Sequence, residues 1–173
     1  MSGSAGRALL VLKKTIACVL VPGFVCVLAA CAQTPTTSGS ASAAGIAAIN
    51  EYNAQTLKAL NSGDVDALNA LMADDYVIFL PGRPPIQGIE GIRAANKSFL
   101  GQWNDRETWT PVETVVQGDL GFQRGTFELV LTPKAGGASR RSVGTYLHVY
   151  QKKPNGKWLL TRAMTTTLPE KTP

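Results

Sequence analysis

Apolar residues recur at helical spacing in the first half of the sequence that follows residue 44. Between 45 and 61 they return every three or four positions, which predicts an amphipathic helix with one buried face. Gly63 stands where a left-handed residue would end this helix, and Asp64 is placed to cap a second, short helix. The same spacing predicts a third helix over 88–103.

The second half of the sequence carries the signals of strands, with β-branched and aromatic residues at alternate positions. The expected strands are 76–80, 107–117, 121–132, 141–153 and 158–167. The loop RPPIQG contains two prolines and is not expected inside a strand. Helices followed by a run of antiparallel strands are typical of an α+β fold.

The last two expected strands form a hairpin around Asn155 and Gly156, a pair that tolerates the positive φ of a tight turn. On its first arm Tyr146, His148 and Tyr150 alternate with other residues, so they share one side of the strand. His148 is the single histidine of the chain. If this side faces a cavity, it forms a polar and partly titratable wall.

The first 30 residues have the shape of a secretory leader. A basic segment precedes an apolar run over 15–30, which is shorter than the roughly twenty residues of a membrane span. The run ends in LAAC at Cys31, which resembles the bacterial lipobox. This resemblance implies a lipoprotein signal peptide over 1–30, a lipidated Cys31, and a location in the bacterial cell envelope, facing away from the cytoplasm. An ordinary cleaved signal is the alternative.

Composition divides the rest of the chain. Residues 31–44 include no bulky apolar side chain, so we expect a flexible tether that holds the domain off the membrane. All the periodic apolar segments lie within 45–168, which is expected to be one domain, and 169–173 form a tail.

Charge and cysteine content limit the partners and cofactors. The formal net charge is +5, and removal of residues 1–30 leaves 14 basic and 12 acidic residues, too small an excess to indicate a nucleic-acid partner. All three cysteines lie at or before Cys31, so the domain is expected to have neither a disulfide nor a thiolate zinc site. No glycine-rich loop follows a strand and no ligand cluster is visible, so we expect no cofactor and no metal.

Several segments resemble SnoaL-like proteins, of the superfamily of ketosteroid isomerase and nuclear transport factor 2. They are ALNSGDVDA at 59–67, ADD at 73–75, GIEGIR at 88–93, and the Asn-Gly turn followed by Lys157 and Trp158. The resemblance covers about 46–166. It implies a cone in which a strongly curved antiparallel sheet wraps around a long N-terminal helix, with two further short helices and an internal pocket. Many members are dimers, which leaves a homodimer open.

The resemblance also allows a test of the isomerase mechanism, in which an Asp base works opposite an oxyanion hole of a Tyr and a protonated Asp. It puts Thr56 where the isomerase has its tyrosine, Leu80 where it has its base, and His148 where it has its second oxyanion donor. Leu80 cannot take a proton, and the hydroxyl of Thr56 is a poor substitute for a phenol. Steroid isomerisation by this mechanism is therefore not expected.

Other residues keep two interpretations. His148 is the candidate general acid or base, or else a histidine that only lines the pocket. Arg124 either places a cation inside the cone, where it could bind a carboxylate, or lies on the convex face. The tryptophans are expected mainly in packing. The expected pocket residues are Thr56, Leu80, Trp103, Arg124, Tyr146, His148 and Tyr150.

Three functions remain, and the sequence leaves open whether the protein is an enzyme. The first is a membrane-tethered, non-catalytic protein that binds a small apolar or amphipathic ligand. The second is an isomerase, cyclase or hydrolase that uses His148. The third is a module for dimerisation or protein interaction through the open sheet face. The loss of a base at Leu80 favours the first.

Overall fold

The computed structural model describes residues 37–169 of the chain. The predicted signal peptide, the lipidated Cys31, the first part of the tether and the end of the tail lie outside these residues. Within them, no helix has the length and hydropathy that a membrane crossing requires.

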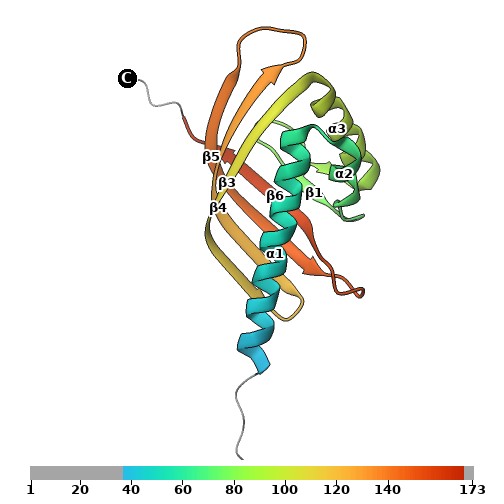
Figure 1. Cartoon of the computed structure of the whole chain (residues 1–173), viewed down its shortest axis with the longest axis vertical. Helices are drawn as coiled ribbons and strands as arrows, with labels where there is room; N and C mark the ends of the chain where they lie inside the picture. Colours follow the sequence, from blue (N-terminus) through green and yellow to red (C-terminus); the bar gives the residue numbers. More distant parts are fainter. Residues whose placement is uncertain (1–36, 170–173) are drawn as a thin grey trace, which may run out of the picture. The chain divides into compact units, whose positions relative to one another are not determined.

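The described domain has three helices and six strands (Figure 1). The helices are α1 (Thr37–Ser62), α2 (Val65–Ala70) and α3 (Ile89–Gln102), and the strands are β1 (Val77–Phe79), β2 (Ile86–Gln87), β3 (Trp103–Gln117), β4 (Leu120–Pro133), β5 (Arg140–Lys152) and β6 (Trp158–Thr167). The sheet order is β2-β1-β6-β5-β4-β3. The pairs from β3 to β6 are antiparallel, whereas β1 runs parallel to β6.

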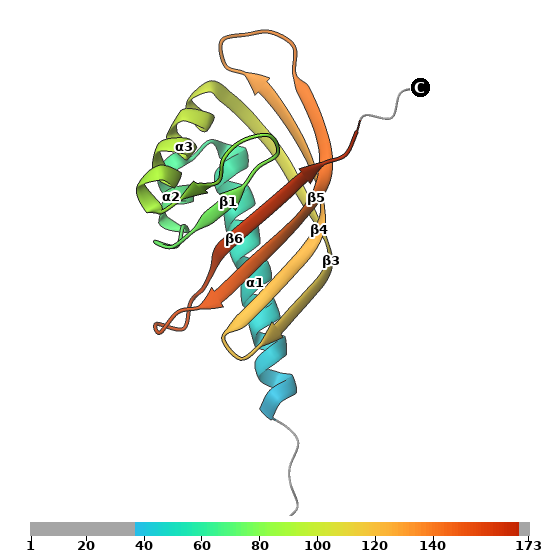
Figure 2. The same ribbon diagram turned by 180° about the vertical axis from the view of Figure 1, so that it is seen from behind.

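The sheet curves without closing, and α1 lies along its concave side, which we call the inner face (Figures 1 and 2). The two short helices sit together beside one end of α1. Apolar residues of α1, β5 and β6 form the main core, including Ile49, Tyr52, Tyr150, Trp158 and Leu160. This confirms the α+β class and the arrangement of a curved sheet around a long helix.

Helix α1 begins earlier than the sequence indicated, at Thr37, so the expected tether boundary at residue 44 is wrong. The first turns pack on the end of β3, where Ser42 Oγ donates to the carbonyl oxygen of Val116 at 3.2 Å. A Cβ added to Gly45 would lie 2.7 Å from the Val116 side chain. Alanine favours helix, and the small side chains let the helix approach the sheet.

The turn and capping signals behave as expected. Gly63 has φ 69° after the end of α1, and the Asp64 side chain caps α2. In the hairpin between β5 and β6, Gly156 has φ 82°, and the Asn155 side chain accepts a hydrogen bond from the Lys157 backbone N–H at 3.1 Å. These turns set the register of the hairpin that carries the candidate site.

One strand begins clearly earlier than expected, and one short strand was not expected. Strand β3 begins at Trp103, four residues before the expected start, because its polar first residues pair with β4. The short strand β2 forms at the end of the proline-containing loop and pairs with β1. The longer β3 places additional polar side chains on the sheet.

At two glycines of the curved sheet, neighbouring atoms lie so close that a larger side chain would not fit. A Cβ on Gly125 would meet the Tyr146 hydroxyl at 2.8 Å, and one on Gly144 would collide with a backbone oxygen of β6. The register of β3 on β4 also shifts between Pro111 and Glu113, which marks a bulge. The absence of a side chain at Gly125 therefore leaves room for the ring of Tyr146.

Candidate functional site

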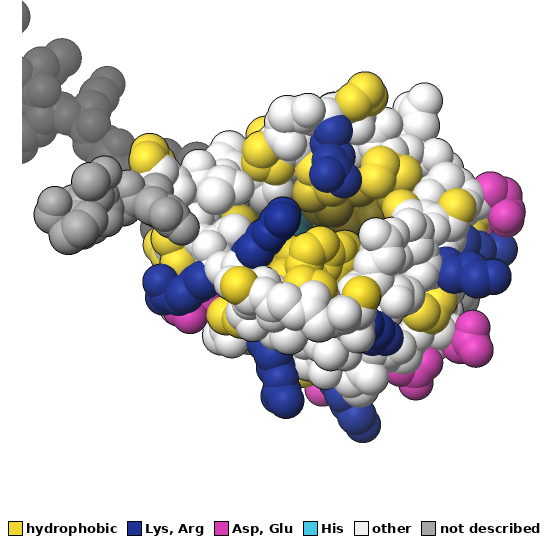
Figure 3. All heavy atoms as spheres, turned by 90° about the horizontal axis from the view of Figure 1, so that it is seen from above, with side chains coloured by type: hydrophobic (Ala, Val, Ile, Leu, Met, Phe, Trp, Pro, Cys, Tyr) yellow, Lys and Arg dark blue, Asp and Glu magenta, His cyan; other side chains and the backbone are white. Residues whose placement is uncertain are grey.

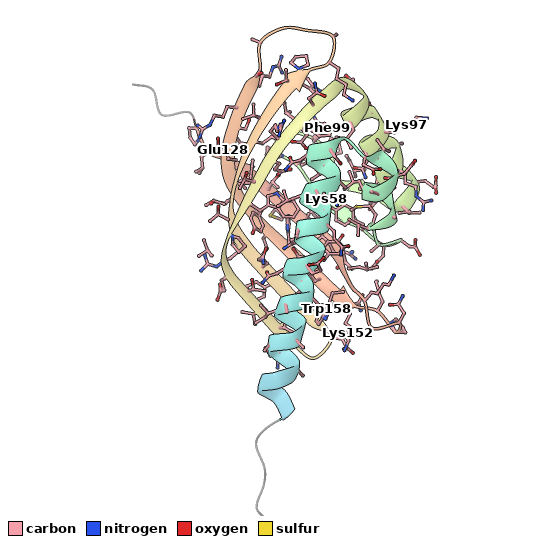
Figure 4. The ribbon with its side chains drawn as sticks, viewed as in Figure 1. Lys58, Lys97, Phe99, Glu128, Lys152 and Trp158 are labelled. Atoms are coloured by element: carbon pink, nitrogen blue, oxygen red, sulfur yellow. The ribbon has the colours of Figure 1, made fainter. Side chains whose placement is uncertain are left out.

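The candidate site is built from side chains on the inner face of the sheet. Strands β3 and β5 supply them at alternate positions: Trp103, Asp105, Glu107 and Trp109 from β3, and Tyr146, His148 and Tyr150 from β5. Figure 3 shows the domain hollowed at one end, with hydrophobic side chains lining the hollow and basic side chains beside it. In Figure 4 the labelled side chains Lys58 and Phe99 lie toward one end of the domain and Trp158 toward the other.

His148 is packed among aromatic rings and is 3% exposed. The ring centroid of Trp109 lies 4.8 Å from that of His148, edge to face, and the centroid of Tyr146 lies 4.4 Å away. Burial lowers the pKa of His148 to about 3, because the charged imidazolium would lose its hydration. The imidazole is therefore neutral at physiological pH.

Hydrogen bonds fix the tautomer of His148. Its Nδ1 lies 3.2 Å from the hydroxyl oxygen of Tyr150, and that hydroxyl donates to Asn53 Oδ1 on α1 at 2.7 Å. Because the single proton of Tyr150 goes to Asn53, His148 Nδ1 must carry a hydrogen and donate it. Nε2, on the far side of the ring from the backbone, is then an unprotonated acceptor.

A buried glutamine extends this network. Gln123 on β4 is 0% exposed, and its Oε1 accepts from Asn53 Nδ2 at 2.8 Å and from the Tyr146 hydroxyl at 2.9 Å. Its Nε2 donates to Thr114 Oγ1 at 2.9 Å and to Asn50 Oδ1 at 3.2 Å. The network joins α1 to three strands and holds both tyrosines in place.

Two carboxyl groups on β3 belong to the site, and neither was predicted from the sequence. Asp105 is 4% exposed and burial raises its pKa to about 6. Burial likewise raises the pKa of Glu107 to about 7, and the charge of Asp105 adds to this rise. Glu107 Oε1 accepts from the indole Nε1 of Trp109 at 2.8 Å. The alternation in WNDRETW, with two tryptophans bracketing two acids on one strand face, is the signal that could have revealed them.

Asn61 near the end of α1 fixes the position of Glu107. Its Nδ2 donates to the Glu107 carbonyl oxygen at 2.9 Å, and its Oδ1 accepts from the Glu107 backbone N–H at 2.6 Å. Both backbone groups of Glu107 are thus bound to α1. This contact places the two acids between the sheet and the C-terminal part of the helix.

Three other residues expected in the pocket are partly or fully buried, and two of them have a partner within the fold. Thr56 is buried, and its hydroxyl donates to the backbone oxygen of Tyr52 at 2.9 Å, so its proton is used within the helix. Leu80 directly follows β1 and is partly buried. Trp103 is partly buried, with the guanidinium of Arg140 5.5 Å above its ring.

Arg124 lies outside the site, so the expectation that it places a cation in the cone is wrong. Its neighbours Gln123 and Gly125 are buried on the inner face, and strand alternation turns Arg124 to the outer face, where it is exposed. There its Nε donates to Glu113 Oε2 at 2.6 Å. The parity of β4 was not readable from sequence, because a glutamine occupies the buried position.

The outer face carries a second feature. A shallow depression of about 390 Å³ is lined partly by Arg124 and by the exposed apolar side chains Val112, Leu147 and Met164. These residues form the patch on which another protein surface could pack. Among residues 37–169, no group of three or more His, Cys, Asp or Glu is placed to hold a metal ion.

Comparisons with known proteins agree with this architecture. The profile of the SnoaL-like domain matches residues 53–160. A conserved protein from Planctomyces limnophilus is 26% identical, with a TM-score of 0.67 over 73% of this chain and 99% of that chain. A ketosteroid isomerase-like protein from Erwinia carotovora atroseptica is 27% identical, with a TM-score of 0.64 over 71% and 95%.

A nuclear transport factor 2-like superfamily protein from Salmonella enterica shares the fold at 15% identity, with a TM-score of 0.62 over 72% of this chain and 91% of that chain. A comparison with curated protein sequences gives no match. The family profile spans more than half of the chain and most of the described domain, and the solved structures share its arrangement of sheet and helix. This chain therefore belongs to the SnoaL-like domain family.

Proposed function

We propose that this protein is a membrane-tethered lipoprotein whose cone binds a small, mainly apolar molecule through hydrogen-bond donors on that molecule. The SnoaL-like fold is typical of ligand-binding domains and of enzymes such as isomerases and dehydratases. The observation that carries the proposal is the fixed, neutral His148, whose free Nε2 is a hydrogen-bond acceptor set in an aromatic wall. Pockets of this make-up bury an apolar body and orient it by a few polar contacts.

The low pKa of His148 favours binding over chemistry at this residue. An imidazole with a pKa of about 3 takes up a proton poorly at physiological pH, so it is a weak general base. It still accepts a hydrogen bond. The network through Tyr150, Asn53 and Gln123 would keep its ring in place when a ligand enters and leaves.

The tether rests on the sequence alone. The lipobox-like LAAC at Cys31 supports lipidation, and acyl chains on that cysteine would hold the domain at a membrane surface. The domain would then present its cone to molecules in the cell envelope.

A second candidate is an enzyme that moves a proton, and Glu107 is the observation that favours it. Its pKa of about 7 lies near physiological pH, where a carboxyl group can both donate and accept a proton. The bond from Trp109 fixes one of its oxygens. On this reading Glu107, and not His148, would be the acid or base of an isomerase or dehydratase type of reaction.

A thermal-shift screen of the full-length chain in detergent tests the proposal. The probes are small aromatic alcohols and phenols, each paired with the methyl ether that lacks its donor. We expect the donors to stabilise the protein more than their ethers. His148→Phe, which keeps a ring in the wall, should weaken donor binding by about 0.5–1.5 kcal/mol. Arg124→Gln on the outer face is the matched control and should leave the difference between the donors and their ethers unchanged.

Two results would contradict ligand binding at His148. One is equal stabilisation by alcohols and ethers, and the other is unchanged affinity in His148→Phe. Catalytic turnover of any bound probe that is lost in Glu107→Gln but kept in His148→Phe would favour the enzyme instead.

A further inference from the structure

Asp105 is a buried carboxyl group without a partner in the described part of the chain. Its side chain lies on the inner face of β3 and is 4% exposed, and neither carboxylate oxygen has a hydrogen-bond partner within residues 37–169. A buried carboxylate that accepts no hydrogen bond destabilises the folded state, since it loses its hydration without a compensating interaction. A ligand that brings donors would remove this cost.

The groups around Asp105 do not supply the missing donors. Glu107, two residues along on the same face, makes no hydrogen bond with Asp105, and its Oε1 accepts from the indole Nε1 of Trp109. Burial raises the pKa of the Tyr76 phenol, so this group keeps its hydrogen, but it makes no hydrogen bond with either oxygen of Asp105. His148 is neutral, and the nearby Arg140 lies over the ring of Trp103.

The ion pairs of the described residues also do not neutralise the two carboxyl groups at this end of the cone. They join Arg93 to Glu90, Arg124 to Glu113, Arg141 to Glu128, and Lys153 and Arg162 to Asp75. None of these pairs includes Asp105 or Glu107. The basic side chains beside the hollow in Figure 3 lie at the surface, where water and salt screen their charge. The inner end of β3 is therefore acidic and rich in acceptors.

We infer that the cone selects a small amine, with its protonated nitrogen at Asp105 and its apolar body against the rings of Trp109 and Tyr146. This inference rests on the proposed binding function and names its ligand class. An ammonium has three donors and no acceptor, which matches two unpartnered oxygens beside a second carboxyl group. Aromatic faces also attract a cation.

Other ligand classes fit this end less well. A hydroxyl brings one donor and leaves the charge of the carboxylate uncompensated, and a carboxylate ligand would be repelled. The free Nε2 of His148 is an acceptor as well, so both Asp105 and His148 can accept a hydrogen bond from the ligand. Of these three ligand classes, only the amine supplies both a positive charge and hydrogen-bond donors for the unpaired oxygens.

Titration calorimetry on the full-length chain in detergent tests the inference with benzylamine, benzyl alcohol and benzoate. We expect benzylamine to bind most tightly. Measurements in buffers that differ in their heat of ionisation show how many protons are taken up or released on binding. We expect benzylamine to cause proton release, because its ammonium favours the ionised forms of Asp105 and Glu107. Asp105→Asn, close in shape, should weaken benzylamine by about tenfold or more and leave benzyl alcohol nearly unchanged. Glu113→Gln removes an exposed carboxylate and is the control.

Each possible result either supports or contradicts the inference. Tighter binding of benzylamine, lost in Asp105→Asn and kept in Glu113→Gln, supports the inference. If benzyl alcohol or benzoate binds as tightly as benzylamine or more tightly, the inference that the cone selects an amine is wrong, but the proposal that the cone binds a small ligand stands. Benzylamine binding that Asp105→Asn does not change overturns the placement. Failure of all three probes, together with failure of the alcohol screen, counts against both the amine and the binding function.

Discussion

Replacing Asp105 by asparagine should stabilise the ligand-free protein at neutral pH. Burial raises the pKa of Asp105 from its ordinary value of 3.8 to about 6. The folded state therefore holds this proton more tightly than the unfolded chain does. Below the ordinary value the carboxyl is protonated in both states and costs nothing, and as pH rises through about 6 the folded state progressively loses stability.

The size of this effect follows from the shift. About two pKa units correspond to about 3 kcal/mol of unfolding free energy at neutral pH. Asparagine keeps the shape of the side chain and removes the charge. Asp105→Asn should therefore be more stable than the wild type by up to about 3 kcal/mol at neutral pH, with the difference vanishing in acid.

Chemical denaturation of the full-length chain at a series of pH values measures this difference directly. The exposed variant Glu113→Gln is the control for loss of a carboxylate and should show no comparable gain. A variant Asp105→Asn that is less stable than the wild type at neutral pH would refute the reasoning. So would a difference of the same size at every pH, since it would not come from ionisation.

Three further changes have defined outcomes. Cys31→Ser should abolish partitioning of the expressed protein into detergent, and unchanged membrane fractionation would contradict lipidation. Gly144→Ala places a methyl group against the backbone oxygen of Thr166 and 2.6 Å from the ring of Phe127, and should lower the free energy of unfolding by at least about 1–3 kcal/mol in a thermal melt. Gly101→Ala, where a Cβ meets nothing within 4 Å, is the control and should not destabilise. Domains of this fold often form dimers, so we expect the full-length chain to sediment as a dimer and Leu147→Lys on the outer face to release monomers. A persistent dimer in that variant would place the interface elsewhere.

The sequence predicted most of the fold because local signals agree with it. The helical spacing before Gly63, the cap at Asp64 and the turn at Gly156 all specify elements that the structure contains. Strand alternation also grouped Tyr146 with His148 on one side. These features depend on neighbours along the chain, which the sequence displays.

The rest of the site depends on contacts that the sequence does not display. Asp105 and Glu107 lie in a polar stretch, and they are on the inner face only because β3 pairs with β4 from Trp103 onward and α1 binds its backbone. Arg124 was ambiguous because either parity of its strand puts a polar residue inside. The depressed pKa of His148 arises from the rings and helix that bury it.

Nitrogen-15 NMR of the single histidine tests the central claim most directly, because its signal needs no assignment. In the full-length chain at neutral pH we predict a neutral ring with hydrogen on Nδ1 and none on Nε2. Addition of the probe that stabilises the protein most should shift the Nε2 resonance as it accepts a hydrogen bond. A ring that titrates near the ordinary histidine pKa, a hydrogen on Nε2, or a resonance that the probe leaves unchanged would contradict a ligand held at His148.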